Sequence, residues 1–530
     1  MTTVGESLIR LLEAQGVDTV FGIPGVHTVE LYRGLTGSGI RHVTPRHEQG
    51  AGFMADGFAR ASGKPGVAFV ITGPGLTNTL TAMAQARADS VPMLVVSGVN
   101  ARATLGKGLG HLHELPDQRG LAAKVALRAF RVESPEELQP AVEEAFAAMT
   151  AARPGPVHIE IPTDVMALPA APPRPPAAPP SPASEPPREK IAQAAALLEN
   201  AKRPLILAGG GAKHAAKAVQ ALAERLGAPV ALTTNARGLL HAHPLGVPAS
   251  PSFKAVRALA AESDAVLALG TEFGPTDFDM YGDGGWTFPE NLVRVDVDAE
   301  QLARRPAAVA IPADAALAVQ ALLEALGGAR QGRNAGEEGE RRAARARAAA
   351  RLELSPAMQR QLEAVEAIRD ALPNSLIVGD STQPVYAANL FYDHDRPGGW
   401  FNAATGYGAL GFGLPAAIGA QLALPDASVV CLSGDGGLQF VLAELGAALD
   451  ADAPVITVVW NNRGYREIEE SMRGAGVEPV GVSPQPPDFS AIAAAYGMGS
   501  ERVETVQALP DALHRAKKTG RPALIELLMP

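Results

Sequence analysis

The sequence predicts an α/β protein built from three doubly wound parallel-sheet domains. Short apolar segments typical of buried strands alternate with helical segments throughout the 530 residues, which are too many for one core. Two changes in composition divide the chain: residues 169–188 are rich in Pro and Ala, and residues 327–352 are rich in Gly, Arg, Glu and Ala. We therefore expect two linkers between domains at 1–168, 189–326 and 353–530.

Hydrophobic periodicity predicts the individual elements. Helices are expected at 5–15 and 52–62 and between 440 and 449. Strands are expected as short apolar runs bounded by Gly, Pro or polar residues. They fall at 19–22, 67–71 and 93–97 in the first domain, at 204–208, 230–232, 265–269 and 293–297 in the second, and at 376–378, 429–433, 455–459 and 523–528 in the third.

Charge and cysteine content argue against several classes of protein. The chain has 46 Lys and Arg against 56 Asp and Glu, a formal net charge of −10, which disfavours a nucleic-acid or anionic-membrane partner. The single cysteine, Cys431, rules out an intrachain disulfide framework and fits a reducing compartment. The first residues lack the basic and apolar regions of a signal peptide, and no apolar run reaches membrane-spanning length. We therefore expect a cytoplasmic protein without a membrane partner.

The most informative motif joins an aspartate and an asparagine that follow two successive strands. Asp435 lies in a Gly-rich turn after the strand at 429–433, and Asn462 follows the strand at 455–459. Both side chains are expected at one edge of the sheet, because parallel sheets bind ligands at the carboxyl ends of their strands. With the Gly464 carbonyl they form a set of hard oxygen ligands suited to Mg²⁺ and phosphate oxygens. The glycines of the turn would let backbone N–H groups approach a diphosphate: Gly434, Gly436 and Gly437.

Further candidates lie near helix starts in the first domain. Pro24-Gly25 and Gly73 stand in tight turns after strands, and Asn78 falls in the first turn of the following helix. Glu48 stands after a short strand and close to a helix start. Taken singly, Glu48 is a cap or first-turn acid, and the glycines are ordinary strand-to-helix connections. The Gly-Asp-Gly and Asn-Asn segments are likewise common in turns and loops.

The order of these motifs is more specific than any one of them. Over nearly its whole length the chain resembles the acetolactate synthase and 2-oxo acid decarboxylase superfamily of thiamin-diphosphate enzymes. That resemblance implies that the first domain binds the cofactor's pyrimidine and the third its diphosphate. It also implies a site between domains of two subunits, in a homodimer or homotetramer. The segments that carry it are 21–25, 46–51, 73–78, 89–92, 408–417, and 434–437 with Asn462.

The resemblance implies a role for each matching residue. Glu48 would exchange a proton with the cofactor's aminopyrimidine ring. Asp435, Asn462 and the Gly464 carbonyl would bind Mg²⁺, and Leu410 would be the apolar wedge that bends the cofactor. The other cofactor contacts would come from the Gly408 carbonyl, from Ser381 and Thr382, from the turns at Pro24, Gly25 and Gly73, from Asn78, and from Gly434, Gly436 and Gly437.

Two departures from the acetolactate synthases bear on the reaction. Those enzymes carry an Arg-Phe-Asp-Asp-Arg stretch that helps to hold FAD. Residues 270–279 lack both arginines, so FAD is not expected. Where the synthases place a Phe-Gln pair near the substrate, this chain has His111 and His113. Imidazoles there suit the transfer of a proton after CO₂ leaves. The alternative is that the two histidines only line a polar loop.

Three segments resemble one particular sub-family and therefore suggest a substrate. Residues 25–32, 113–118 and 379–386 look most like 5-guanidino-2-oxopentanoate decarboxylases, and His27 in the first of these segments is expected to contact substrate.

The guanidinium of that 2-oxo acid needs a carboxylate partner, ideally a bidentate one. Glu469 is the first candidate, and Glu114 and the acids of 272–279 are the others. For each of them, the alternative is a solvated acidic surface.

The expected reaction is the non-oxidative decarboxylation of a 2-oxo acid to an aldehyde and CO₂ by a carbon–carbon lyase. A carboligase that joins the decarboxylated fragment to a second carbonyl compound is the first alternative, and product analysis separates the two. A binding protein without catalysis is disfavoured because Glu48, Asp435 and Asn462 are all present. A nicotinamide dehydrogenase is also disfavoured, because the glycines at 209–211 lack the full dinucleotide fingerprint.

Overall fold

The computed structural model describes residues 2–150, 153–174, 185–280, 282, 284–328 and 334–529, excluding the side chains of 334 and 335. These residues form two compact units. The first comprises Met1–Pro182, Gly406–Glu504 and Arg515–Pro530, and the second comprises Ala183–Thr405 and Thr505–His514. Within the two predicted linkers, residues 175–184 and 329–333 lie outside the described residues. The predicted domain limits therefore stay a prediction.

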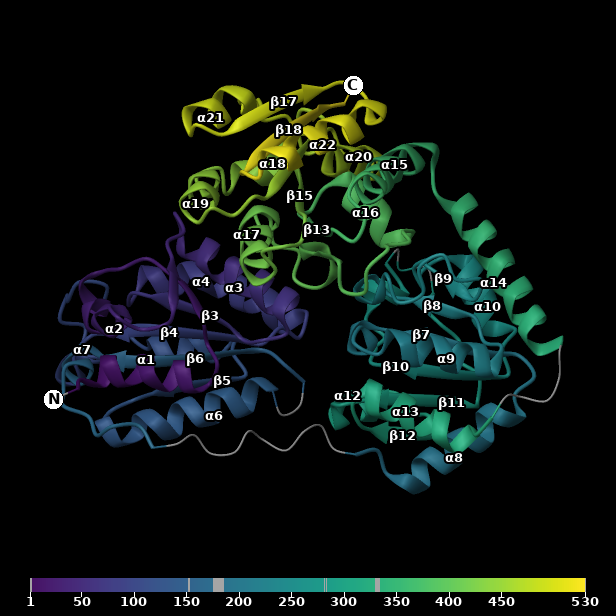
Figure 1. Ribbon diagram of the computed structural model, residues 1–530, viewed down its shortest axis with the longest axis horizontal. Helices are drawn as coiled ribbons and strands as arrows, with labels where there is room; N and C mark the ends of the chain where they lie inside the picture. The colour runs from purple at the N-terminus through teal and green to yellow at the C-terminus, as the bar shows by residue number, and fades with distance from the viewer. Residues whose placement is uncertain are drawn as a thin grey trace. The chain divides into compact units, whose positions relative to one another are not determined.

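Three six-stranded sheets with flanking helices confirm the predicted fold class (Figure 1). The strand orders are β2-β1-β3-β4-β6-β5, β12-β11-β10-β7-β8-β9 and β14-β13-β15-β16-β18-β17. When the strands of each sheet are numbered from its own start, the first and third sheets have the same order, although the sequence shows no clear internal repeat. The strand order reverses at β1/β3 in the first sheet and at β7/β10 in the central sheet. Such reversals are where parallel sheets commonly bind ligands.

The first sheet has helices on both faces. On one face, α1 and α6 enclose a core that contains Leu8, Val67, Val96 and Phe146 (Figure 1). Helix α1 begins with a capping box in which Thr3 and Glu6 bond to each other's backbone N–H groups. The strands are β1 (Thr19–Gly22), β2 (Arg41–Val43), β3 (Gly66–Val70), β4 (Met93–Val99), β5 (Arg128–Arg131) and β6 (Pro156–Pro162). The helices are α1 (Val4–Ala14), α2 (Val29–Leu35), α3 (Glu48–Ser62), α4 (Pro74–Ala88), α5 (Gln118–Ala122), α6 (Leu138–Thr150) and α7 (Thr163–Met166), with 3₁₀ turns η1 (Val26–Thr28), η2 (Arg102–Thr104) and η3 (Pro135–Glu137).

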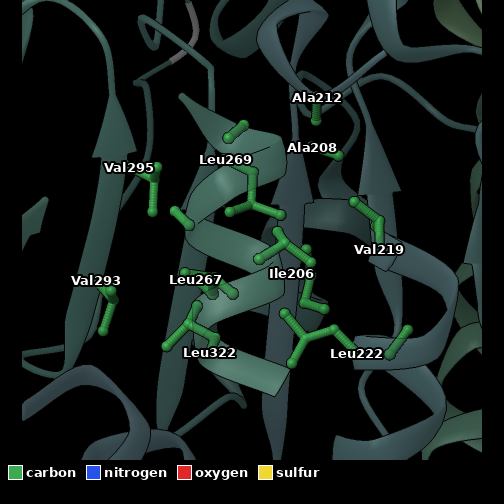
Figure 2. Packing of buried hydrophobic residues seen from close by; sticks show 14 of the residues in the cluster. Ile206, Ala208, Ala212, Val219, Leu222, Leu267, Leu269, Val293, Val295 and Leu322 are labelled. Atoms are coloured by element: carbon green, nitrogen blue, oxygen red, sulfur yellow. The ribbon is translucent and has the colours of Figure 1, made fainter. Parts of the chain in front are cut away.

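The central sheet packs against apolar helix faces in the second unit. Ile206, Leu267 and Leu269 of the sheet pack with Leu222 of α9 and Leu322 of α13 (Figure 2). The strands are β7 (Pro204–Ala208), β8 (Val230–Leu232), β9 (Gly246–Val247), β10 (Ala265–Leu269), β11 (Leu292–Asp296) and β12 (Val309–Pro312). The helices are α8 (Arg188–Asn200), α9 (Ala216–Leu226), α10 (Lys254–Ala261), α11 (Pro275–Phe278), α12 (Ala299–Ala303) and α13 (Ala315–Leu326), with η4 (Gly210–Ala212) and η5 (Thr234–Ala236). Two further helices follow, α14 (Asn334–Glu353) and α15 (Pro356–Ala371).

The third sheet repeats the alternation of strand and helix. Its strands are β13 (Leu376–Gly379), β14 (Trp400–Asn402), β15 (Val429–Gly434), β16 (Ile456–Asn461), β17 (Gly499–Val503) and β18 (Ala523–Leu528). The helices are α16 (Gln383–Leu390), α17 (Gly413–Ala423), α18 (Asp435–Gln439), α19 (Glu444–Asp450), α20 (Arg466–Gly474), α21 (Phe489–Ala495) and α22 (Leu509–Thr519), with η6 (Ala403–Thr405) and η7 (Val506–Ala508).

One predicted helix is shorter than predicted and one is longer. The helix expected between 440 and 449 begins four residues late, as α19 at Glu444, because residues 440–443 form turns with i→i−3 hydrogen bonds such as Val441 N–H to the Leu438 carbonyl. Helix α3 starts four residues earlier than predicted, at Glu48, and His47 caps it by accepting the Gln49 N–H.

Candidate active site

The turns after β1 and β3 carry four of the predicted cofactor residues. Pro24 and Gly25 follow β1, whereas Gly73 and Asn78 lie at the start of α4. Gly25 has no room for a side chain, since a Cβ there would lie 2.4 Å from Cγ2 of Ile71. The two turns therefore pack closely against each other at the point where the strand order reverses.

Glu48 is paired with Asn78. Nδ2 of Asn78 donates to Oε2 of Glu48 at 3.0 Å, which joins the first turn of α3 to the first turn of α4. Glu48 is half-buried as the first residue of α3. The structure thus brings together two residues that the sequence analysis assigned separately to the cofactor.

The start of α3 also lies beside the loop that carries Leu410. Nε2 of Gln49 donates to the Leu410 carbonyl at 3.4 Å, and the Ala409 N–H donates to Oε1 of Gln85 at 3.3 Å. Gly408 has a positive φ of 76°, which is accessible to glycine at low cost. These contacts lie within one chain and place Leu410 next to the residue that follows Glu48.

Glu444 is a buried acid, not expected from the sequence, that binds the turn just before Glu48. Its carboxylate accepts the Arg46 N–H at 3.0 Å and the His47 N–H at 3.1 Å, just before α3 begins. Gly50 lies directly against this carboxylate, since a Cβ there would lie 2.4 Å from Oε1 of Glu444 and would force that side chain to move. The only local signal is an acid among the apolar residues of α19, which is a weak indication. Glu444 therefore helps to orient the turn from which Glu48 projects.

The ionisation of Glu444 is expected to make stability depend on pH. Burial raises the pKa of Glu444 from its ordinary value of 4.5 to about 7, against the opposing effect of the Arg46 and His47 N–H groups. Because the folded-state pKa is the higher one, the free energy of unfolding falls as the pH rises through this interval and levels off above it. We expect Glu444→Gln to lack this fall, and to be more stable than wild type at pH 8 by up to about 3 kcal/mol.

Thermal unfolding of both proteins between pH 4 and pH 8 measures the effect. Glu144→Gln, on the exposed surface of α6, is the control that should track wild type at every pH. A wild-type minus Glu444→Gln difference that does not change with pH would contradict the assignment.

Asp435 lies where the motif predicts, at the junction of β15 and α18. Its side chain is 1% exposed, and Oδ2 accepts the Gly464 N–H at 3.0 Å. Burial raises the pKa of Asp435, while N–H groups that include those of Asn462 and Gly464 lower it. The aspartate and the segment after β16 therefore meet at one edge of the sheet. Gly434, Gly436 and Gly437 flank the aspartate, and a Cβ on Gly436 would lie 2.5 Å from the Tyr465 ring.

These residues fit a diphosphate held through a divalent cation. A cation beside the buried Asp435 would favour its ionised form, and the Asn462 amide and Gly464 carbonyl add neutral oxygens. Among the described residues, no group of three or more His, Cys, Asp or Glu side chains is placed to hold a metal. The predicted set is of a different kind, because it has a single carboxylate and relies on phosphate oxygens from the ligand.

Ser381 and Thr382 belong to the second unit. They follow β13, where Ser381 N–H donates to Oδ1 of Asp380 at 2.8 Å and Thr382 is the N-cap of α16. Their predicted contact with the diphosphate stays a prediction.

Two histidines predicted for different tasks lie together. The rings of His27 and His113 have centroids 5.2 Å apart, and Nδ1 of each ring is buried without a hydrogen-bond partner among the described residues. Burial lowers the pKa of His27, and the charge of His113 lowers it further. His111 is exposed and lies two residues before His113 in the same loop. The structure thus pairs His113 with His27.

Glu114 is engaged by its own loop. Oε1 accepts the Gly108 N–H at 2.8 Å, and Oε2 accepts those of Gly110 and His111 at 2.8 and 3.0 Å. Desolvation raises the pKa of Glu114, but these backbone N–H groups outweigh it, so the pKa lies below its ordinary value. The carboxylate predicted to bind substrate therefore also shapes the histidine loop.

Glu469 is already paired with two arginines. Its oxygens lie 2.5 Å from Nη1 of Arg466 and 2.6 Å from Nη2 of Arg473. The Arg473 side chain is 67% exposed, so this ion pair is weak and can open at little cost. A substrate guanidinium would have to take the place of one of these arginines.

Comparison with known proteins agrees with three cofactor-enzyme domains. Residues 2–121 match the thiamine pyrophosphate enzyme N-terminal TPP binding domain, residues 191–322 match the central domain, and residues 380–527 match the C-terminal TPP binding domain. The chain therefore belongs to the thiamine pyrophosphate enzyme family, and its matched domains support thiamin diphosphate as the cofactor.

Full-length relatives narrow the class further. The chain is 44% identical over 534 residues to the probable 2-ketoarginine decarboxylase AruI of Pseudomonas aeruginosa, covering 99% of this chain and 94% of that protein. It is 33% identical over 516 residues to the acetolactate synthase isozyme 1 large subunit of Escherichia coli, covering 94% and 88%. It is 31% identical over 560 residues to a probable acetolactate synthase large subunit of Methanocaldococcus jannaschii, covering 99% and 91%.

The helices give one further negative finding. None of those in the described part of the chain is both long enough and apolar enough to cross a membrane.

Proposed function

We propose that the protein is a thiamin-diphosphate- and Mg²⁺-dependent decarboxylase that converts 5-guanidino-2-oxopentanoate to 4-guanidinobutanal and CO₂. The observation that carries the proposal is the 44% identity, over 99% of this chain, to a protein named as a probable 2-ketoarginine decarboxylase. The pairing of Glu48 with Asn78 and the buried Asp435 turn support it from the structure.

The bound cofactor would supply the carbon that adds to the substrate's keto group and the electron sink for the bond that releases CO₂. Asp435, Asn462 and the Gly464 carbonyl would hold Mg²⁺, and the N–H groups of Gly436 and Gly437 would hold the diphosphate. Glu48, steadied by the Asn78 amide, would hold and return a proton at the pyrimidine ring.

A proton must also reach the substrate carbon that loses CO₂ before the aldehyde can leave. His113 is proposed as the donor because it lies in the predicted substrate loop and packs against His27. Burial and the neighbouring His113 both lower the pKa of His27, so this pair disfavours a charge on His27. His111, which is exposed, is the less favoured donor.

Glu469 is proposed as the partner of the substrate guanidinium. Glu469 is only 7% exposed, and its carboxylate already binds the guanidinium groups of Arg466 and Arg473. A third guanidinium entering from the substrate would displace the more exposed one, Arg473.

The test of this substrate uses an uncharged isostere. We expect wild type to release CO₂ from 5-guanidino-2-oxopentanoate with a kcat/KM at least about 100-fold above that for 2-oxo-5-ureidopentanoate, because a neutral urea cannot make the charge-assisted pair with the carboxylate that a guanidinium makes. Glu469→Gln should remove most of this preference by raising KM for the guanidino substrate alone. Glu470→Gln, on the exposed side of the same helix, is the matched control.

If Glu469→Gln keeps the full preference, another acid holds the guanidinium. Equal rates on both substrates for wild type would contradict the proposed substrate.

Carboligation is the second candidate function, favoured by the full-length likeness to acetolactate synthases. In that case the decarboxylated fragment would meet a second carbonyl compound instead of a proton. Pyruvate would then give a 2-hydroxy ketone or a 2-hydroxy-2-methyl acid, whereas the decarboxylase would give only aldehydes.

We also propose that the protein works in the cytoplasm as a homodimer or homotetramer with its active site at a subunit interface. Apolar side chains on the loops next to the histidines support such an interface, since Val26, Leu109 and Leu112 are 73%, 62% and 63% exposed in the single chain.

A further inference from the structure

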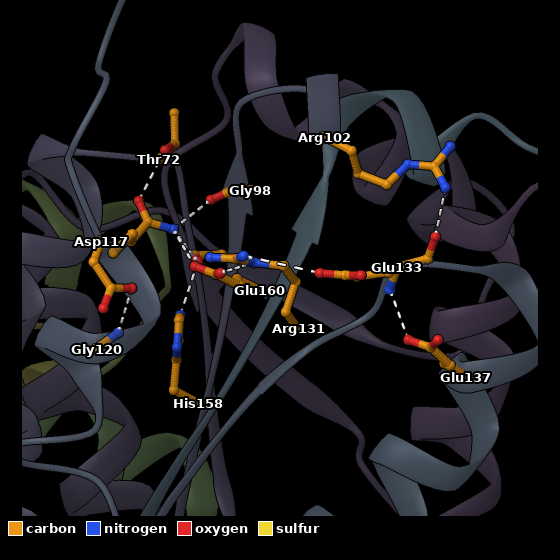
Figure 3. A network of polar contacts seen from close by, with 12 residues as sticks. Thr72, Gly98, Arg102, Asp117, Gly120, Arg131, Glu133, Glu137, His158 and Glu160 are labelled. Atoms are coloured by element: carbon orange, nitrogen blue, oxygen red, sulfur yellow. Dashed lines mark hydrogen bonds and ion pairs between the residues drawn. The ribbon is translucent and has the colours of Figure 1, made fainter. Parts of the chain in front are cut away.

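Gln118 is a buried residue whose side-chain amide forms hydrogen bonds through both its oxygen and its nitrogen. It is 2% exposed as the first residue of α5. Oε1 accepts the Thr72 hydroxyl and the Gly73 N–H, each at 2.8 Å. Nε2 donates to the Gly98 carbonyl at 2.9 Å, to Oγ of Ser97 at 3.2 Å and to Oε2 of Glu160 at 3.0 Å. One side chain thereby connects the ends of β3, β4 and β6 (Figure 3).

The two glycines bound by Gln118 lie directly against the two histidines. A Cβ on Gly73 would lie 2.6 Å from the His113 carbonyl oxygen, and a Cβ on Gly98 would lie 2.7 Å from that of His27. The backbone of each histidine therefore rests on a glycine that Gln118 holds by a hydrogen bond.

The rest of the network explains why this amide is hard to replace. Glu160 is buried, and its Oε1 lies 2.5 Å from Nε of Arg131. Burial raises the pKa of Glu160, and the charge and hydrogen bond of Arg131 act in the opposite direction. His158 lies against Ser97, with its Nε2 at 2.8 Å from the serine hydroxyl (Figure 3). An apolar residue at 118 would leave buried donors and acceptors on both sides without partners.

We propose that Gln118 is a positioning residue that sets the spacing of His27 and His113 by tying Gly73 to Gly98. The inference rests on the proposed function only in so far as these histidines deliver the proton. The geometric claim itself can be tested without turnover.

The test follows histidine titration in the full-length protein with thiamin diphosphate and Mg²⁺. Protein labelled at histidine Cε1 is titrated by NMR, and His27→Asn and His113→Asn assign the two signals. In Gln118→Met we expect the pKa of His27 to rise by about half a unit or more, because the ring moves away from His113 and gains access to water. His243 and His514, in the second unit, serve as internal references. Gln139→Met in α6 makes the same replacement outside the network and should leave both signals unchanged.

Kinetics give a second readout. We expect Gln118→Met to lower kcat about 10-fold or more with little change in KM, since proton delivery is affected more than binding. If Gln118→Met does not fold, Thr72→Val decides, because it removes one donor to Oε1 and should shift His27 in the same direction by a smaller amount.

Unchanged His27 and His113 titrations in a folded Gln118→Met protein would overturn the proposal, as would an unshifted Thr72→Val if that variant has to decide. If wild type releases no CO₂ from 5-guanidino-2-oxopentanoate while the His27 shift appears, the proposed function fails and the positioning role stands. If wild type releases CO₂ from this substrate but the His27 pKa does not shift in the folded variant, the positioning role fails and the proposed function stands.

Discussion

Glu48→Gln is expected to bind thiamin diphosphate with nearly wild-type affinity and to lose turnover by about 10²–10⁴-fold. The replacement keeps the shape of the side chain, and the Asn78 amide can still donate to its remaining oxygen. It removes only the ability to hold and return a proton. The loss should therefore appear in kcat rather than in cofactor affinity.

Steady-state CO₂ release, together with cofactor titration by calorimetry, separates the two quantities. Glu144→Gln, an exposed acid on α6, is the matched control and should behave as wild type. Full activity in Glu48→Gln would remove Glu48 from the chemistry. A large loss of cofactor affinity would instead give it a binding role.

Asp435→Ala is expected to weaken the Mg²⁺-dependent binding of thiamin diphosphate by at least about 100-fold. The aspartate is the only carboxylate in the predicted ligand set, and it also accepts the Gly464 N–H that orders the segment after β16. Its loss removes the negative charge that binds the cation and one anchor of the third ligand. Circular dichroism should show an intact fold, because the substitution is to a small residue at a helix start.

Cofactor affinity measured across a range of Mg²⁺ concentrations gives the result. Asp426→Ala, in the exposed turn before β15, is the control. An Asp435→Ala protein whose cofactor affinity still rises with Mg²⁺ as in wild type would show that the cation binds elsewhere.

Strands and turns were predictable where short-range signals decide the structure. Strands β7, β8 and β10 have the predicted bounds, because each is a run of apolar residues bounded by clear breaks. Strand β18 also has its predicted bounds, although Glu526 interrupts its apolar run. The turn at Asp435 was also predictable, since glycines permit a tight strand-to-helix turn there and the parallel strand order brings Asn462 to the same edge.

Strand β6 was missed although it is buried along its whole length. His158 and Glu160 interrupt its apolar pattern, and only the network of Ser97, Arg131 and Gln118 makes their burial tolerable. The short strands β9 and β17 gave weak signals for other reasons, since β9 has two residues and β17 is largely exposed at a sheet edge. Strand β6 therefore depends on contacts with residues that are distant in sequence.

The same limit applies to the candidate site. Glu444 and Gln118 could not be identified from sequence because their partners, Arg46 and Gly73 among them, lie far away along the chain or in another element. The contact between His27 and His113 could not be predicted either, although each histidine is a site candidate from the sequence. For Glu114 and Glu469 the sequence identified charged residues, and the structure adds the groups they already bind.

The most direct test of the account is a product balance for the holoenzyme acting on 5-guanidino-2-oxopentanoate. CO₂ and the organic product are measured together, with and without thiamin diphosphate and Mg²⁺, and pyruvate is run in parallel. The account predicts equal amounts of CO₂ and 4-guanidinobutanal, dependence on both cofactors, and little acetolactate from pyruvate. Rapid formation of acetolactate from pyruvate, with no aldehyde from the guanidino substrate, would contradict it and make the protein a carboligase.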